Sequence, residues 1–132
     1  GGVYLGGTGA ANKLDDYESG TFTPTVNSGT FSTVYARYTK VGARVFIDCR
    51  ITLTGTRTTA AFHIGGLPFT SKVNNYTTGA VVASNYTGGG EWLAALSVSS
   101  ATFVVFQEQG SDALGTEFGN GYLMFSLSYE AA

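Results

Sequence analysis

The sequence is poor in residues that bind metals or form disulfides. It has one cysteine, Cys49, and one histidine, His63, among 132 residues. A single thiol cannot form an intramolecular disulfide, and a zinc site built on thiolates needs several such ligands. No apolar run approaches the ~18 residues that a transmembrane helix needs. These absences exclude a disulfide framework, a cysteine-based zinc site and a membrane-spanning helix, and we expect no metal and no cofactor.

Charge is also scarce. Charged residues make up only 12% of the chain, and no lysine or arginine follows Lys72. Because there is no basic stripe to neutralise phosphates, we expect no binding of nucleic acid. A low charge content is typical of a chain that buries part of its surface against another chain. An ordinary surface rich in threonine, serine and asparagine would explain the composition equally well.

Short alternating segments, separated by Gly, Asn, Ser and Thr, fill most of the chain. Such segments are typical of β-strands joined by turns, and no stretch of ~10 residues has a helical period with caps. The pattern predicts an all-β fold, an antiparallel, jelly-roll-like β-sandwich of about eight strands. The expected strands are 20–26, 33–40, 43–54, 60–66, 79–86, 91–98, 102–108 and 121–130.

The clearest strand is the segment 43–54. Its residues alternate between two faces, so one face enters the core and the other points outward. Cys49 falls on the apolar face, and we expect a buried core residue rather than a reactive thiol. Phe46 falls on the outward face with Asp48 and Arg50, where it could cover a neighbouring sheet or a second protomer. The predicted core face consists of Val45, Ile47, Cys49, Ile51 and Leu53.

Glycine and proline mark several expected turns. Gly42 supplies the positive φ that a tight turn before the segment 43–54 needs. Pro24 predicts an edge strand or an irregular first strand, and Pro68 should end the strand at 60–66, because proline donates no hydrogen bond to a ladder. Leu67 and Phe69 should then plug one end of the sandwich.

Three stretches resemble the C-terminal domains of bacteriophage tail-fibre and tailspike-like proteins. They are LDDYESGTFTPTV at 14–26, RYTKVGARVFI at 37–47 and IGGLPFTS at 64–71. The three follow the order in which that group has them and span residues 14 to 71. Residues 72–120 match none of its motifs.

The resemblance implies a homotrimeric receptor-binding tip at the distal end of a tail fibre, in the virion. Residues 1–19 would be an extended neck from an upstream fibre shaft, and residues 20–132 the tip domain. The acidic residues at 15–18 either dock this neck or form a solvated linker. The implied partner is a host surface polysaccharide or an outer-membrane receptor, without membrane insertion. Since no catalytic site defines the group, we expect non-enzymatic binding, with receptor specificity in 72–120.

The loop 85–92 is the best candidate for a ligand site. Its three glycines should leave it flexible and exposed, and its aromatic, amide and carboxylate groups are those that bind sugars. Alternatively, Trp92 belongs to the core, because it alternates with Ala94 and Leu96. The candidate ligand-binding residues are Asn85, Tyr86, Glu91 and Trp92, with Tyr76 and Asp112 as weaker candidates.

Two other functions stay open at this point. The domain could be a structural trimerisation or folding cap with no ligand. It could instead cleave glycans, which needs two opposed carboxylates, but the sequence places none of its loop carboxylates face to face. His63 is not accompanied by a Gly-x-Ser-x-Gly nucleophile motif, so we expect a surface or interface residue.

Overall fold

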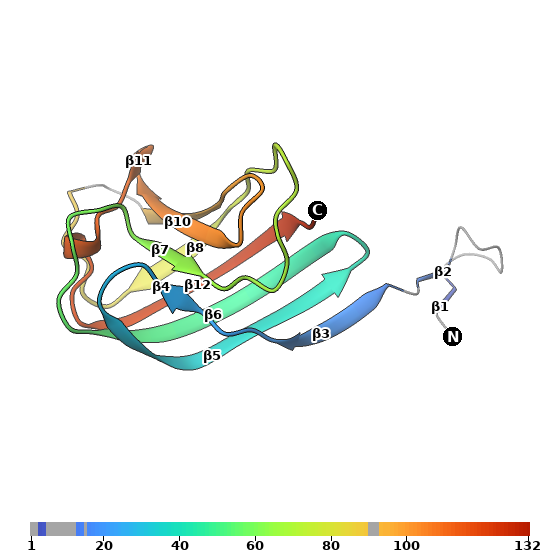
Figure 1. Ribbon diagram of the computed structural model, residues 1–132, viewed down its shortest axis with the longest axis horizontal. Helices are drawn as coiled ribbons and strands as arrows, with labels where there is room; N and C mark the ends of the chain where they lie inside the picture. Colours follow the sequence, from blue (N-terminus) through green and yellow to red (C-terminus); the bar gives the residue numbers. More distant parts are fainter. Residues whose placement is uncertain (1–2, 5–12, 15, 90–92) are drawn as a thin grey trace.

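The computed structural model describes residues 3–4, 13–14, 16–89 and 93–132. Within them the regular elements are β-strands, apart from one short 3₁₀ turn, η2 (Gly115–Glu117). The all-β prediction is therefore confirmed. The strands in Figure 1 are β1 (Val3–Tyr4), β2 (Lys13–Leu14), β3 (Tyr17–Thr21), β4 (Thr25–Val26), β5 (Thr30–Val41), β6 (Arg44–Thr54), β7 (His63–Gly65), β8 (Thr78–Ala83), β9 (Leu93–Ser97), β10 (Phe103–Glu108), β11 (Ser111–Asp112) and β12 (Gly121–Glu130).

Most of these strands form one antiparallel sheet. Its order is β3-β5-β6-β12-β8-β9-β10-β7-β4, with β11 paired to β10. The sheet curls so that its two halves face each other (Figure 1). β8 joins the halves, because residues 81–83 pair with β12 and residues 78–80 pair with β9. We call the part with β3, β5, β6 and β12 the first half, and the part with β9, β10, β7 and β4 the second half.

At the other margin the chain itself connects the two halves. β3 pairs with β5 at the edge of the first half, and β4 pairs with β7 at the edge of the second. Residues 22–24 cross between them, and Pro24 is buried at this corner. The single strand predicted at 20–26 is therefore wrong. It is two strands, because the chain changes sheet halves at a proline that cannot continue a ladder.

The core lies between the two halves. The five residues of β6 predicted to face inward are each at most 2% exposed, and β12 pairs with β6 along its whole length. From the opposite side, the rings of Phe62, Phe106 and Phe118 meet at centroid distances of 4.9 to 5.9 Å. Burial raises the pKa of the Cys49 thiol to about 12, as expected for a thiol that packs as a small apolar residue.

β9 turns inward the face that the sequence did not predict. Ala94 and Leu96, which one of the two interpretations of Trp92 places on the core face, are only half-buried, whereas Ala95 and Ser97 are 0% exposed. Ala95 pairs with Gly79 of β8 at the junction of the two halves, where Gly79 lies so close to the Ser126 backbone that any side chain on it would overlap the carbonyl. The Ser97 hydroxyl is hydrogen-bonded within the fold, so its burial leaves no polar group unsatisfied.

Turns and strand ends follow the glycines. Gly42 has a φ of 58° between β5 and β6, as predicted. The strand predicted at 60–66 shrinks to β7 and ends before Gly66, whose φ is 79°. Leu67 is buried and Phe69 half-buried, as expected of residues that plug one end. The sheet has more strands than the eight predicted, because the segment 20–26 divides into β3 and β4 and because β11 is too short to show an alternation.

Candidate functional site

The two ends of the curled sheet carry different features (Figure 1). The chain enters through β3 at the neck end, where Lys40 donates two hydrogen bonds, of 2.8 and 2.9 Å, to the Asp16 carboxylate. This contact docks one of the acidic residues at 15–18 onto the domain. The opposite end, which we call the far end, carries the loop after β8, the β10–β11 hairpin and the η2 segment, residues 113–120.

Tyr86 connects the η2 segment and β10 at the far end. It forms a β-bridge with Phe118, and the two rings lie 5.0 Å apart. Its hydroxyl donates a hydrogen bond of 2.7 Å to the Glu108 carboxylate on β10. Burial raises the pKa of Tyr86, and the hydrogen bond to Glu108 and the negative charges of Glu117 and Glu108 raise it further. The phenol therefore stays neutral at physiological pH and acts as a donor.

Gly88 lies against the Tyr86–Glu108 pair. A side chain at this position would overlap both the Tyr86 hydroxyl and the Glu108 carboxylate. The glycines of the loop predicted flexibility, but at Gly88 the lack of a side chain permits a close approach. The loop can therefore fold over the pair only with glycine at this position.

Hydrogen bonds tie the loop after β8 to the η2 segment. The Thr87 amide donates to the Glu117 carbonyl at 2.8 Å, and the Gly119 amide donates to the Asn85 carbonyl at 2.6 Å. The Asn85 side-chain amide donates to the Asn120 carbonyl. Asn85 is exposed, but these bonds make it a support of the loop as well as a candidate ligand contact.

The other predicted site residues are not all brought together. Asp112 lies at the far end, exposed and hydrogen-bonded across its hairpin. Tyr76 is 63% exposed, but it follows Asn75, which is hydrogen-bonded to the end of β12 at the neck end. Tyr76 therefore does not lie beside the other candidates, because the chain between them runs the length of β8. Glu91 and Trp92 lie outside the described residues.

Arg57 is a component of the far end that the sequence did not reveal. It is 8% exposed, and burial lowers its pKa. Its Nε donates to the Phe118 carbonyl at 2.7 Å, and its Nη groups donate to the Thr54 and Gly55 carbonyls and to the Asn120 side chain, each at 3.2 Å. Arg57 thus clamps the β6–β7 connection to the η2 segment. Only the packing shows this, since an arginine among glycine and threonine is typical of an exposed turn.

A shallow groove of about 280 Å³ runs between the β6–β7 connection and the η2 segment. Its lining offers threonine hydroxyls, a guanidinium and backbone groups, which can hydrogen-bond the hydroxyls of a sugar. Among the described residues, no three His, Cys, Asp or Glu side chains are grouped so that they could hold a metal ion. The groove is lined by Gly55, Thr56, Arg57, Thr116, Phe118 and Gly119.

His63 lies away from the far end, on β7. It is half-buried and stacks on Phe103, with ring centroids 4.8 Å apart and an interplanar angle of 14°. The neighbouring Asn27 uses its side chain to hold the backbone amide of His63 at 2.9 Å. The stacking on Phe103 and the hydrogen bond from the backbone amide therefore explain where the imidazole ring lies.

The fold and the far end define an antiparallel all-β domain with a loop cluster opposite the point where the chain enters. No helix in the described part of the chain is long and apolar enough to cross a membrane. Comparison with protein-family models, with curated proteins and with solved structures finds no match to the chain.

Proposed function

We propose that the chain is the receptor-binding tip of a bacteriophage tail fibre. In this proposal it is a jelly-roll-like, homotrimeric domain at the distal end of the fibre in the virion, and it binds a host-surface glycan without cleaving it. The neck end faces the upstream shaft, and the far end meets the host. The observation that carries the proposal is the way in which the three resembling segments pack together.

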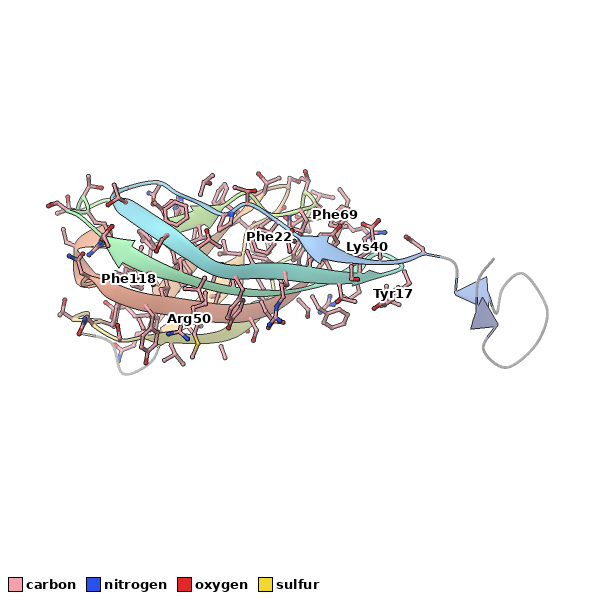
Figure 2. All side chains as sticks on the ribbon, turned by 90° about the horizontal axis from the view of Figure 1, so that it is seen from below. Tyr17, Phe22, Lys40, Arg50, Phe69 and Phe118 are labelled. Carbon is pink, nitrogen blue, oxygen red and sulfur yellow. The ribbon has the colours of Figure 1, made fainter. Side chains whose placement is uncertain are left out.

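The segments 14–26, 37–47 and 64–71 form one contiguous framework. The first supplies β3, which pairs with β5 of the second, and β4, which pairs with β7 of the third. Tyr38 and Phe69 meet edge to face at 5.4 Å. Figure 2 labels Lys40 and Phe69 beside each other, and the Lys40 Nζ lies 5.6 Å from the Phe69 ring centroid.

Glycines within these segments fit against residues of the other segments. Gly66 of the third segment lies against the backbone of Thr23 and Pro24 in the first, where any side chain would overlap the Thr23 carbonyl. Gly20 of the first segment lies against the Tyr38 ring of the second. A Cβ atom on residue 20 would be only 3.0 Å from that ring. The residues that carry the resemblance thus pack against one another in the fold.

The unmatched residues 72–120 supply the loop after β8, the β10–β11 hairpin and the η2 segment. These three make the far end, whereas the resembling segments dominate the neck end (Figure 1). Loops carried on a rigid sheet are the usual place for binding residues, since they vary without disturbing the core. A shared framework with a variable far end is the arrangement that a receptor-binding tip needs.

The chemistry of the far end favours neutral sugars. Among the described residues of this end, the carboxylates Glu108, Asp112 and Glu117 outnumber the buried cation Arg57, so a phosphate-rich or sulfate-rich ligand would be repelled. Exposed hydroxyl and amide groups match the hydroxyls of a polysaccharide. We expect weak binding at each site, strengthened by three copies in a trimer.

The test is binding of the purified chain to an array of bacterial surface polysaccharides. Asp112→Ala and Thr116→Ala should each weaken binding about tenfold, and Glu18→Ala at the neck end, the matched control, should leave it unchanged. A stable trimer that binds no polysaccharide and no host cell would overturn the proposal in favour of a structural cap. Release of reducing ends from a bound polysaccharide would overturn its non-enzymatic part.

A further inference from the structure

The outer face of the first half, which β8 extends beside β12, is not covered by any other described element. Figure 2 views the molecule from this side, with β3 and β5 nearest the viewer. Two large apolar side chains on this face, Phe46 of β6 and Val82 of β8, are 50% and 47% exposed. Exposed apolar side chains that gather on one sheet face mark an interaction surface more often than scattered ones do.

The strand register shows what surrounds these two side chains. Phe46 lies opposite Thr39 on one side and Ser128 on the other, so the ring projects above small hydroxyl side chains. Val82 lies opposite Met124 in the neighbouring strand. The face is therefore uneven, with one prominent ring and an apolar pair further along the sheet.

Two shallow hollows flank the Phe46 ring. One, of about 430 Å³, extends over β12 and β8 as far as Thr78 and Ser126, and the other, of about 550 Å³, extends over β5 and β3 as far as Ser19. Phe46 and Asp48 line both hollows. The face thus has a projecting aromatic ring and, beside it, depressions large enough to receive such a ring.

The charged groups of this face are not neutralised by one another. Arg37 is paired in register with Asp48, yet its guanidinium lies over the Tyr35 ring at 4.7 Å, and no described residue gives the Asp48 carboxylate an ion pair or hydrogen bond. Arg50, labelled in Figure 2, lies over Tyr122 at 5.0 Å, and its buried Nε has no hydrogen-bond partner among the described residues. The Asp48 carboxylate and the Arg50 Nε can therefore accept and donate further hydrogen bonds, respectively.

We propose that this face packs against a second copy of the chain, an inference that rests on the homotrimer of the proposed function. A ring-shaped trimer needs two complementary patches on each protomer. The face supplies both, as a projecting ring beside hollows and as arginines beside an unpaired aspartate. Arginine, tyrosine, phenylalanine and methionine are also the residue types enriched at protein interfaces.

The size of the face suits such a contact. Its three central strands are 12, 11 and 10 residues long, which is about 35 Å at ~3.3 Å per residue. With the shorter β3 and β8 beside them at ~4.8 Å spacing, the face covers roughly 700 Å². A stable interface buries ~800 Å² on each partner, and a protomer in a ring divides this face between two neighbours, so its two contacts together bury about as much as one such interface.

Light scattering after size-exclusion chromatography tests the inference on the full chain. Phe46→Asp and Val82→Asp place a charge in the proposed contact and should each weaken assembly at least about 100-fold, giving monomers at micromolar concentration. The matched control is Val73→Asp, since Val73 is 63% exposed in the turn before Tyr76 and should leave the oligomer intact. Circular dichroism checks that each variant is folded.

A second measurement covers a variant that fails to fold. A photo-crosslinking phenylalanine derivative at position 46 keeps the aromatic ring and should give covalent dimers on illumination. A wild-type oligomer that persists in both aspartate variants, or that gives no crosslink from position 46, would overturn the assignment of this face and leave the proposed function standing. A monomeric wild-type chain would instead overturn the homotrimer itself.

Discussion

At the scale of single residues, Gly66 shows why the framework of the neck end depends on sequence. Its φ of 79° lies in the left-handed region, and the Thr23 carbonyl occupies the space that a side chain would need. Gly42 also has a positive φ, 58°, but a Cβ there would meet nothing within 4 Å. Comparing substitutions at Gly66 and Gly42 therefore separates the free-energy cost of the left-handed backbone from the free-energy cost of close packing.

We therefore expect Gly66→Ala to lower the free energy of unfolding by about 3 kcal/mol, from left-handed strain plus the overlap with Thr23. Gly42→Ala should cost only about 1 kcal/mol, because the strain acts alone. Denaturant titrations of both variants measure these values. Equal losses in the two would contradict the close packing of the first and third segments.

Cys49 predicts a pH dependence of stability. Its pKa is raised from 9.0 to about 12 by burial, so the folded chain holds the thiol proton more tightly than the unfolded chain does. A raised folded-state pKa contributes stability that is fully present below the unfolded value and is lost as the pH rises through the folded one. The free energy of unfolding should therefore fall between about pH 9 and pH 12.

Cys49→Ala should remove this part of the alkaline slope, although the cavity lowers stability at every pH. The native thiol should also resist alkylation at about pH 8 until denaturant exposes it. Titration with denaturant across the alkaline range, with and without the cysteine, makes the comparison. Rapid alkylation of the folded chain would contradict a core position for this residue.

At the scale of elements, the far end depends on Arg57 as much as on its strands. The η2 segment has only one short turn of regular structure, and Arg57 holds it through the Phe118 carbonyl and the Asn120 side chain. A buried cation satisfied by neutral oxygens is costly to remove, because the acceptors lose their partners. The candidate site is therefore positioned by a residue outside the predicted site loop.

Arg57→Ala should lower the free energy of unfolding by about 2 kcal/mol and speed hydrogen exchange first at residues 116–120. Arg57→Lys should not restore the wild-type value, because a lysine cannot span the same acceptors. Arg44→Ala is the control. Arg44 is exposed and makes one hydrogen bond, of 2.9 Å, to Ser128, so its loss should cost under about 0.5 kcal/mol. Unchanged exchange in Arg57→Ala would contradict the clamp.

At the scale of the whole molecule, the chain closes its core through pairings distant in sequence. β6 pairs with β12 from Arg44 opposite Glu130 to Leu53 opposite Gly121. β8 and residues 22–24 must then join the two halves at opposite margins. Little of this structure can form before distant segments meet, so the entropy of loop closure is lost early in folding.

Folding should consequently take milliseconds to seconds, as in other domains dominated by non-local strand pairing. Stopped-flow circular dichroism in the far ultraviolet measures this relaxation on dilution from denaturant. Dilute protein is the control for a contribution from assembly, because association depends on concentration and strand pairing within one chain does not. A sub-millisecond main phase would contradict the non-local closure.

The predictions from sequence succeeded where a pattern is local and failed where packing decides. The alternation in β6 gave the correct core face, and the freedom of Gly42 gave the correct turn. In β9 the core interpretation of the alternation gave the wrong face, because the pairing with β8 at the junction turns Ala95 and Ser97 inward. Of the site residues, Asn85 and Tyr86 adjoin one another in sequence, whereas their partners on β10 and η2 do not.

The sequence by itself determined that the chain is all-β, with an apolar core stripe on β6 and a turn at Gly42, because side chains in a strand alternate with period two and φ is a property of each residue. Only the tertiary structure decided that β8 joins the two halves, that Arg57 holds the far end and that Phe46 stands among hollows on an uncovered face. Those features depend on the close approach of distant segments, which no local pattern encodes.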